Sequence, residues 1–421
     1  MFCLVICPKV SKTNRSKNKI NNTRVEEFVE LSKAIETLNV KLVLQLNLSK
    51  INAGTFFGHG KINELRVIIK NLEIKLLLID ATISPMQQRN LEKILMVKIL
   101  DRTGLILEIF GNRAQTKEGV LQVNLAHFEY QKTRLVRSWT HLERQRGGIG
   151  FMGGPGETQI ESDRRALNEK IFRIRNDLKK VIKTRRLQRS NRQKNNIPII
   201  SLVGYTNSGK SSIFNYLTNS NVLEKDMLFA TLDPKMSLFS LLGSEKVILL
   251  DTVGFISDLP THLISAFKAT LEEVVHSNII LHVRDISHKE SEQQAEDVKN
   301  TLDRLDWGTK SKPPCIEVYN KIDKLSDSDF NELRSTNGNS KDKVLLSALD
   351  GKGFQYLQNQ IKRSLSYNKK FEELFIDFSD TKRRGWLFNK KVVSSEAIVD
   401  NGFVLRVYWS DDQKRQFRKL S

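Results

Sequence analysis

The chain has 421 residues, which is enough for several domains of about 150 residues each. Its 68 Lys and Arg against 48 Asp and Glu leave a net charge of +20, which favours polyanionic partners such as RNA, DNA or an anionic membrane surface. Three cysteines without a CxxC pair argue against a disulfide-stabilised secreted protein, and no apolar run approaches the roughly 18 residues of a membrane span. We therefore expect a cytoplasmic protein, monomeric in solution and without stable membrane insertion; peripheral contact with a membrane stays open.

Residues 1–115 alternate between short apolar runs and helix-like stretches. The first apolar run, Met1–Cys7, is typical of a strand, whereas residues 24–38 and 84–95 have helical spacing, with Ser84 as a candidate N-cap. This alternation predicts an N-terminal α/β subdomain over residues 1–115.

Residues 116–195 have a helical pattern that the glycine-rich segment 147–156 interrupts once. We expect a helical hairpin, with one arm ending near Arg146, the other starting near Thr158, and the glycines exposed at the tip. The second arm is strongly basic and the first carries several aromatic residues, which are His127, Phe128, Tyr130 and Trp139. Taken alone, a basic run is more often a solvated helix face, and aromatic residues more often pack in a core.

Residues 197–367 alternate strands with helices, the pattern of a doubly wound, mostly parallel sheet. Residues 368–421 contain three strand-like segments around the helix-like stretch 381–391, which predicts a small α+β domain at the C-terminus.

A phosphate-binding loop follows the apolar strand 198–203. Its residues match the pattern GxxxxGK[ST] and are Gly204, Tyr205, Thr206, Asn207, Ser208, Gly209, Lys210 and Ser211. Glycines let backbone N–H groups surround phosphate oxygens, Lys210 reaches the β- and γ-phosphates, and the Ser211 hydroxyl ligates Mg²⁺. A chance glycine turn before a helix is the alternative, and the strand and helix on either side argue against it.

Two further segments have the spacing of nucleotide-sensing switches. The motif DTVG and the next residue form switch II, which comprises Asp251, Thr252, Val253, Gly254 and Phe255. Asp251 ends a strand, where it can hold Mg²⁺ through water, and the Gly254 N–H can approach the γ-phosphate. Phe255 stands where Ras-like enzymes have the glutamine that orients the attacking water, so we expect slow intrinsic hydrolysis that a partner stimulates.

Switch I lies between the phosphate-binding loop and DTVG. Its residues are Phe229, Ala230, Thr231, Leu232 and Asp233, and Thr231 is the candidate hydroxyl ligand of Mg²⁺ in the GTP state. A threonine in an ordinary surface loop is the alternative.

A guanine-reading motif follows the strand 315–319. The two carboxylate oxygens of Asp323 can accept from the N1–H and the 2-amino group of guanine, a pair of donors that adenine lacks. Asn320 and Lys321 belong to the same motif, and Ser347 and Ala348 are candidates to meet the guanine O6 through a backbone N–H. The sequence therefore predicts a GTP hydrolase with bound Mg²⁺.

The chain resembles the HflX-type GTPases, a family of ribosome-associated proteins. Beyond the general GTPase motifs, the resemblance lies in residues 57–61, 101–119, 121–148, 153–165, 228–234 and 251–260. It implies GTP-dependent binding to ribosomal RNA of the large subunit and splitting or rescue of stalled or idle ribosomes. With the net charge, it favours RNA contact by the tip and the second arm, for which the candidates are Gly153, Gly154, Gly156, Arg164 and Arg165. Many members have arginine before the GPGE sequence, where this chain has Gly153-Gly154, so an arginine-based role at the tip is in doubt.

Two other functions stay open. The first is a regulatory GTPase switch that acts on a protein or a membrane without ribosomes. The second is an ATP-driven RNA-remodelling activity of the N-terminal domain, because that domain of the family has been linked to adenine nucleotides. For Gly58-His59-Gly60-Lys61, however, a glycine turn at a helix start is the favoured interpretation.

Overall fold

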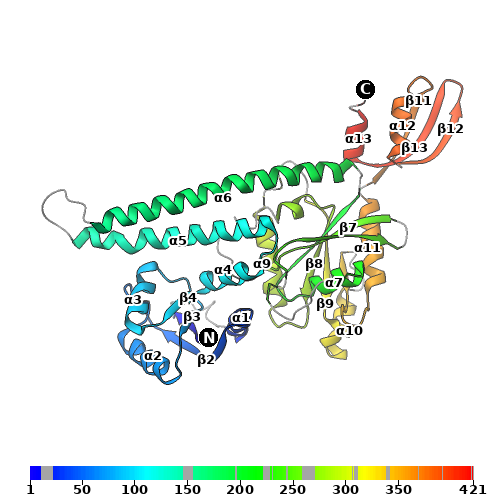
Figure 1. Ribbon diagram of the computed structural model, residues 1–421. Coiled ribbons are helices and arrows are strands. Elements are labelled where there is room, and N and C mark those ends of the chain that lie inside the picture. Colours follow the sequence, from blue (N-terminus) through cyan, green and yellow to red (C-terminus); the bar gives the residue numbers. More distant parts are fainter. Residues whose placement is uncertain are drawn as a thin grey trace.

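The computed structural model of the chain describes residues 1–10, 22–145, 155–194, 197–220, 228–229, 231–242, 245–257, 271–305, 307, 312–337, 342–367, 369–390, 392–418 and 420. Three sheets with separate strand orders, joined by helices, confirm the expected α/β class (Figure 1). We call the parts the N-terminal unit (1–113), the hairpin (117–194), the central unit (197–367) and the C-terminal unit (369–420). Within the described residues, no helix combines the length and the apolar character needed to cross a membrane.

The N-terminal unit is a parallel sheet in the order β2-β1-β3-β4. Its elements are β1 (Phe2–Val10), α1 (Asn22–Lys33), β2 (Asn39–Leu48), α2 (His59–Asn71), β3 (Leu76–Ile79), α3 (Pro85–Leu95), β4 (Lys98–Asp101) and α4 (Arg102–Arg113). Ser84 caps α3 as predicted, because it accepts from the Gln87 N–H while the Gln87 side chain accepts from the Ser84 N–H. Gly58 precedes the first residue of α2, which agrees with a glycine turn at a helix start.

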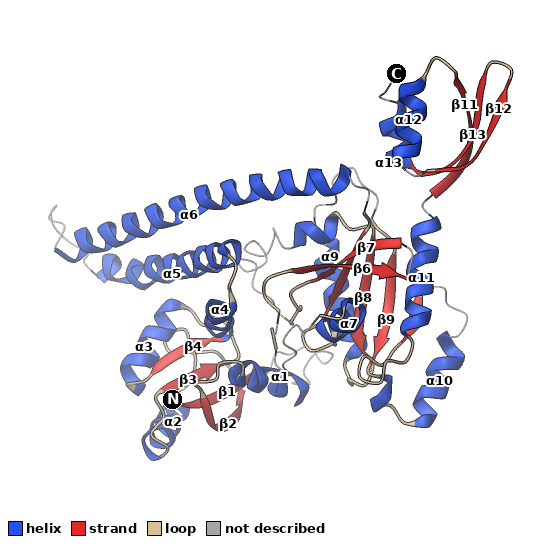
Figure 2. Cartoon of the chain, turned by 45° about the vertical axis from the view of Figure 1, so that its right-hand side comes forward, coloured by secondary structure: helices blue, strands red, loops and turns tan. Residues whose placement is uncertain are grey.

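The hairpin consists of α5 (Lys117–Gln145) and α6 (Pro155–Lys194), which lie side by side over the N-terminal unit (Figures 1 and 2). Ion pairs join the arms: Arg175 meets Glu129 at 2.8 Å and Arg185 meets Glu118 at 3.0 Å. Helix α6 begins at Pro155 rather than near Thr158, because the fixed φ of proline suits the first turn of a helix.

The central unit is a sheet in the order β10-β9-β8-β5-β7-β6, parallel except for the β6–β7 pair. Its elements are β5 (Ile199–Gly204), α7 (Lys210–Thr218), β6 (Lys235–Leu241), β7 (Glu245–Asp251), β8 (Ile279–Asp285), α9 (Ser291–Asp303), β9 (Cys315–Asn320), the short 3-10 helix η1 (Ile322–Lys324), α10 (Asp327–Asn337), β10 (Lys343–Leu345) and α11 (Phe354–Tyr367). All residues of β5 are buried, as expected for a strand between two neighbours and beneath helices.

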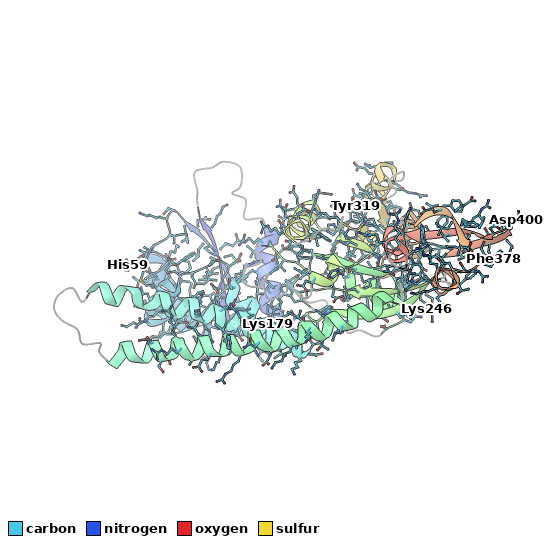
Figure 3. The ribbon with its side chains drawn as sticks, turned by 90° about the horizontal axis from the view of Figure 1, so that it is seen from above. His59, Lys179, Lys246, Tyr319, Phe378 and Asp400 are labelled. Carbon is cyan, nitrogen blue, oxygen red and sulfur yellow. The ribbon has the colours of Figure 1, made fainter. Side chains whose placement is uncertain are left out.

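The C-terminal unit is an antiparallel sheet in the order β11-β13-β12. Its elements are β11 (Lys369–Asp377), α12 (Thr381–Asn389), β12 (Val393–Val399), β13 (Gly402–Ser410) and α13 (Asp411–Arg418). Helix α13, which the sequence pattern did not predict, packs its Phe417 ring 5.2 Å from the ring of Trp409. Asp400 of this unit and His59 of the N-terminal unit lie toward opposite ends of the molecule, with Lys179 of α6 between them (Figure 3).

One apolar core joins the N-terminal unit to the central unit. From α4 it contains Leu105, Ile106, Leu107, Ile109 and Phe110, and from the predicted switches and their neighbours it contains Leu228, Phe229, Leu232, Val253, Phe255 and Ile256. Both switch segments therefore lie at the boundary between these two units.

Candidate functional site

The phosphate-binding loop lies at the carboxyl end of β5 and runs into α7, the context that its motif requires. Two of its glycines have positive φ, 153° at Gly204 and 94° at Gly209. A Cβ at Gly204 would lie 2.1 Å from the Val283 carbonyl oxygen, and one at Gly209 would lie 2.1 Å from the Asn320 side-chain nitrogen. Only glycine therefore fits at either position.

Lys210 is buried beneath this loop. Its ammonium group donates to the carbonyl oxygens of Gly204 at 3.1 Å and Tyr205 at 2.6 Å. Burial lowers the pKa of Lys210 to about 8, against the opposing effect of Asp251. A phosphate group would supply the negative charge that this buried ammonium lacks.

The protein is expected to take up a proton on Lys210 when it binds a nucleotide at alkaline pH. Phosphate oxygens favour the charged form of Lys210, so its pKa in the complex must lie above the value of about 8 in the free protein. Between these two pKa values, binding requires protonation, and the affinity for GDP falls as the pH rises above about 8. Calorimetric titration at about pH 9 in two buffers of different ionisation enthalpy measures the uptake, with neutral pH as the control. Binding heats that do not depend on the buffer at alkaline pH would contradict this prediction.

Three oxygen atoms predicted from the sequence as candidate Mg²⁺ ligands lie close together. The Ser211 hydroxyl lies 2.9 Å from the Thr231 hydroxyl, and these hydroxyls donate to Asp251 Oδ2 at 2.8 and 3.0 Å respectively. Asp251 is fully buried, burial raises its pKa, and its Oδ1 atom has no hydrogen-bond partner among the described residues. Hydroxyl and carboxylate oxygens fit Mg²⁺, which would compensate the buried charge and bridge to nucleotide phosphates.

Switch II pairs with the phosphate-binding loop through its backbone. The Thr206 N–H donates to the Phe255 carbonyl at 2.7 Å, and the Phe255 N–H donates to the Gly204 carbonyl at 3.1 Å. A Cβ at Gly254 would lie 2.7 Å from Thr206 Cγ2, so this close approach requires glycine. The Phe255 side chain is 5% exposed and packs in the core shared with the N-terminal unit. It therefore turns away from water and supplies no polar group to the site. Thr252 is also buried, and its hydroxyl donates to the Leu202 carbonyl at 2.6 Å.

The guanine motif is connected to the phosphate-binding loop. Asn320 donates to the Ser208 carbonyl at 2.8 Å and accepts from the Ala348 N–H at 3.0 Å. The Ser347 hydroxyl donates to Asp323 Oδ1 at 2.6 Å and thereby orients the carboxylate. All predicted guanine-binding residues thus lie together at the carboxyl ends of β9 and β10.

Some site residues were not found from the sequence. Asp285, at the end of β8, forms an ion pair with Lys321 at 2.7 Å, and no motif signals it. Glu27 of α1 accepts from the hydroxyl of Tyr205 at 2.7 Å and from that of Ser257, which follows switch II, at 3.0 Å. These contacts join elements distant in the sequence, so only the folded chain reveals them.

The remaining candidates lie in switch I and the hairpin. Ala230 of switch I and the tip residues Gly153 and Gly154 lie outside the described residues. Gly156 belongs to α6 rather than to the tip, and Arg164 and Arg165 are exposed on that helix. Tyr130 packs inward as an aromatic residue commonly does, and its hydroxyl donates to Asp101 at 2.6 Å.

Comparisons with known proteins cover nearly the whole chain. Residues 22–111 match the family model of the GTP-binding GTPase N-terminal region, residues 113–192 that of the GTP-binding GTPase middle region, and residues 199–321 that of the 50S ribosome-binding GTPase. The GTPase HflX of Magnetococcus marinus is 45% identical over 378 residues, which cover 90% of this chain and 85% of that protein. The GTPase HflX of Escherichia coli is 41% identical over 349 residues, which cover 83% of this chain and 81% of that protein. A crystal structure of a GTP-binding protein from Sulfolobus solfataricus in complex with GDP is 23% identical, with a TM-score of 0.47, and covers 87% of this chain and 99% of that one.

Proposed function

Because this chain belongs to the HflX family of GTPases, we propose that its GTP-bound state binds the large ribosomal subunit and dissociates or rescues stalled or idle ribosomes. The chain is a GTP hydrolase that binds GTP and GDP. The observation that carries the ribosomal proposal is the match of residues 199–321 to the family described as 50S ribosome-binding GTPases. We assign the protein to the cytoplasm, where it would meet ribosomes.

In this proposal the phosphate-binding loop holds the β- and γ-phosphates, and the residues of the guanine motif select the base. Ser211, Thr231 and, through water, Asp251 hold Mg²⁺, which neutralises charge on the phosphates when it is bound. Support comes from the convergence of the three ligand oxygens within 3.0 Å of one another.

The hairpin is the proposed contact with ribosomal RNA. Exposed basic side chains follow α6 and include Arg164, Arg165, Arg173, Lys179 and Lys180. Such a row attracts the phosphate backbone and releases counterions from the RNA when it binds. Its affinity falls steeply as the salt concentration rises, because that release then becomes less favourable. Gly153 and Gly154, which precede α6 in the sequence, and Gly156 in its first turn lack side chains, which suits close approach to structured RNA.

Salt-sensitive cosedimentation tests the proposal. We expect the protein to sediment with large subunits in a non-hydrolysable GTP analogue, and much less in GDP. Replacing Arg164 and Arg165 together with Gln should reduce binding about tenfold at moderate salt, because each lost phosphate contact lowers the salt-dependent affinity. The matched control replaces Lys362 and Arg363, an adjacent exposed basic pair on α11, with Gln.

Binding to anionic vesicles instead of subunits, in the same nucleotide-dependent manner, would favour the regulatory switch on a membrane.

Turnover of GTP gives a second measurement. Since the buried Phe255 offers no group to orient water, we expect large subunits to raise turnover at least about tenfold. Equal turnover with and without subunits would refute partner stimulation.

A further inference from the structure

Switch I contacts the N-terminal unit and the hairpin on both sides of Thr231. Thr231 itself faces Ser211 and Asp251 in the central unit. Phe229 and Asp233, two positions before and two positions after Thr231, instead contact α4 and the segment that leads into α5. This division indicates that parts of the chain outside the central unit help to set the position of the proposed magnesium ligand.

The first contact is apolar and precedes Thr231. The ring of Phe229 packs against that of Phe110 in α4, with centroids 4.6 Å apart and planes at 79°, an edge-to-face arrangement. Both side chains are at most 2% exposed. Leu228 and Leu232 are buried in the same core.

The second contact is polar and follows Thr231. The Asp233 carboxylate accepts from the backbone N–H groups of Gln115 at 2.9 Å and Thr116 at 2.8 Å, and from the Thr116 hydroxyl at 2.5 Å. The Thr116 hydroxyl in turn accepts from the Gly119 N–H at 3.0 Å, the geometry of an N-cap of α5. One carboxylate of switch I is thus bound to the base of the hairpin by three hydrogen bonds.

Gly119 shows how closely the two segments approach. A Cβ at this position would lie 2.3 Å from Asp233 Oδ1, so alanine would displace the carboxylate. Glycine within a helix costs about 1 kcal/mol relative to alanine, so the local helix alone gives no reason for glycine here.

We propose that the base of the hairpin positions switch I for the GTP state, with Thr116 and Asp233 as positioning residues for Thr231. The inference rests on the proposed role of Thr231 as a ligand of Mg²⁺ and does not depend on ribosome binding. Contacts with the γ-phosphate and Mg²⁺ order switch I in the GTP state, and GDP lacks that phosphate. We therefore expect the contact between Asp233 and Thr116 to affect the binding of GTP more than that of GDP. Thermodynamic linkage is reciprocal. GTP binding must therefore stabilise the first turn of α5 by the same free energy by which the folded turn strengthens GTP binding.

Nucleotide affinity with Mg²⁺ present provides the first test. Thr116→Val removes the hydroxyl and keeps the shape, and we expect it to weaken a non-hydrolysable GTP analogue about three- to tenfold while GDP affinity stays unchanged. Gly119→Ala should have the same selective effect, and Thr116→Ser should restore the wild-type ratio. Ser84→Ala is the matched control, since it removes the N-cap of α3, away from switch I.

Hydrogen exchange in the isolated protein provides the second test. In the wild type, the GTP analogue should slow exchange of the backbone amides in residues 117–123 relative to GDP, and Asp233→Asn should abolish most of this difference.

Thr231→Ala separates the inference from the proposed site. If Thr231→Ala lowers the preference for the GTP analogue over GDP and Thr116→Val does not, the positioning role of Thr116 is wrong, but the proposed role of Thr231 as a magnesium ligand is supported. If neither lowers it, the proposed role of Thr231 fails as well.

Discussion

Replacing Asp323 with Asn is expected to lower the affinity for GTP and GDP by about 10⁴-fold, since a site built to satisfy hydrogen-bond donors rejects a mismatched partner strongly. The carboxylate offers two acceptors to guanine, whereas an asparagine side chain turns an NH₂ group toward one of the donors. The Ser347 hydroxyl, which donates to Asp323 Oδ1 at 2.6 Å, can also donate to the asparagine oxygen, so the loop should keep its structure. Xanthine has a carbonyl in place of the 2-amino group, so the variant should prefer XTP.

Equilibrium titrations with GDP, GTP and XTP measure this change. Asp327→Asn, at an exposed position in the first turn of α10, is the matched control and should bind GTP like the wild type. A variant that kept wild-type GTP affinity would show that Asp323 does not read the base. Turnover of ATP that survived in Asp323→Asn would instead favour a separate ATP-driven activity in the N-terminal unit.

Replacing Arg102 with Met is expected to lower the free energy of unfolding of the N-terminal unit by about 3–5 kcal/mol, the usual cost of leaving buried charges without their partner. The Arg102 side chain is 4% exposed, pairs with Glu27, and donates to Asp80 Oδ1 at 2.9 Å. It also donates to the Ser257 carbonyl at 3.1 Å. Burial alone would lower the pKa of Arg102, but the two carboxylates raise it on balance, so the residue stays charged.

Methionine preserves much of the volume, so the expected loss comes from charge rather than from a cavity. Native-state hydrogen exchange of the β3 and β4 amides measures the change in one unit of a multidomain chain, where a single unfolding transition is not assured. Arg165→Met is the control, because its ion pair with Glu161 is exposed and should contribute less than about 1 kcal/mol. A change for Arg102→Met as small as that of the control would mean that the remaining partners, Arg24 for Asp80 and Tyr205 and Ser257 for Glu27, compensate the two carboxylates.

The Arg102 cluster also contacts the candidate nucleotide site. Glu27 accepts from Arg102, from the Tyr205 hydroxyl and from Ser257. A single carboxylate thus connects the N-terminal unit with the phosphate-binding loop and with the second residue after switch II. With the Asp233 contact, switch I and the segment that follows switch II are both bound to elements outside the central unit. Residues of the N-terminal unit and of the segment that leads into α5 therefore contact the candidate nucleotide site directly.

Much of the site could be predicted from the sequence because its chemistry is local. The phosphate-binding loop needs glycines at Gly204 and Gly209, a lysine and a hydroxyl at fixed spacing, and a strand and a helix around them. Each requirement concerns residues adjacent in the chain. The same holds for the Ser84 cap and for the two arms of the hairpin, which their 3.6-residue periodicity and the intervening glycines indicate. Domain boundaries and the roles of individual site residues remain predictions.

The tertiary structure alone decided which distant residues support the site. Glu27, Arg102 and Asp285 stand in ordinary helical or strand-end positions, and nothing in their neighbours signals a contact with the nucleotide-binding segments. Asp233 was expected as part of switch I, yet its contact with Thr116, over a hundred positions earlier, follows from how α4 and α5 pack against the central unit. The sequence by itself determined the GTPase motifs, because phosphate and guanine recognition depends on short, fixed spacings. How the N-terminal unit holds those motifs depends on long-range packing, which local pattern does not encode.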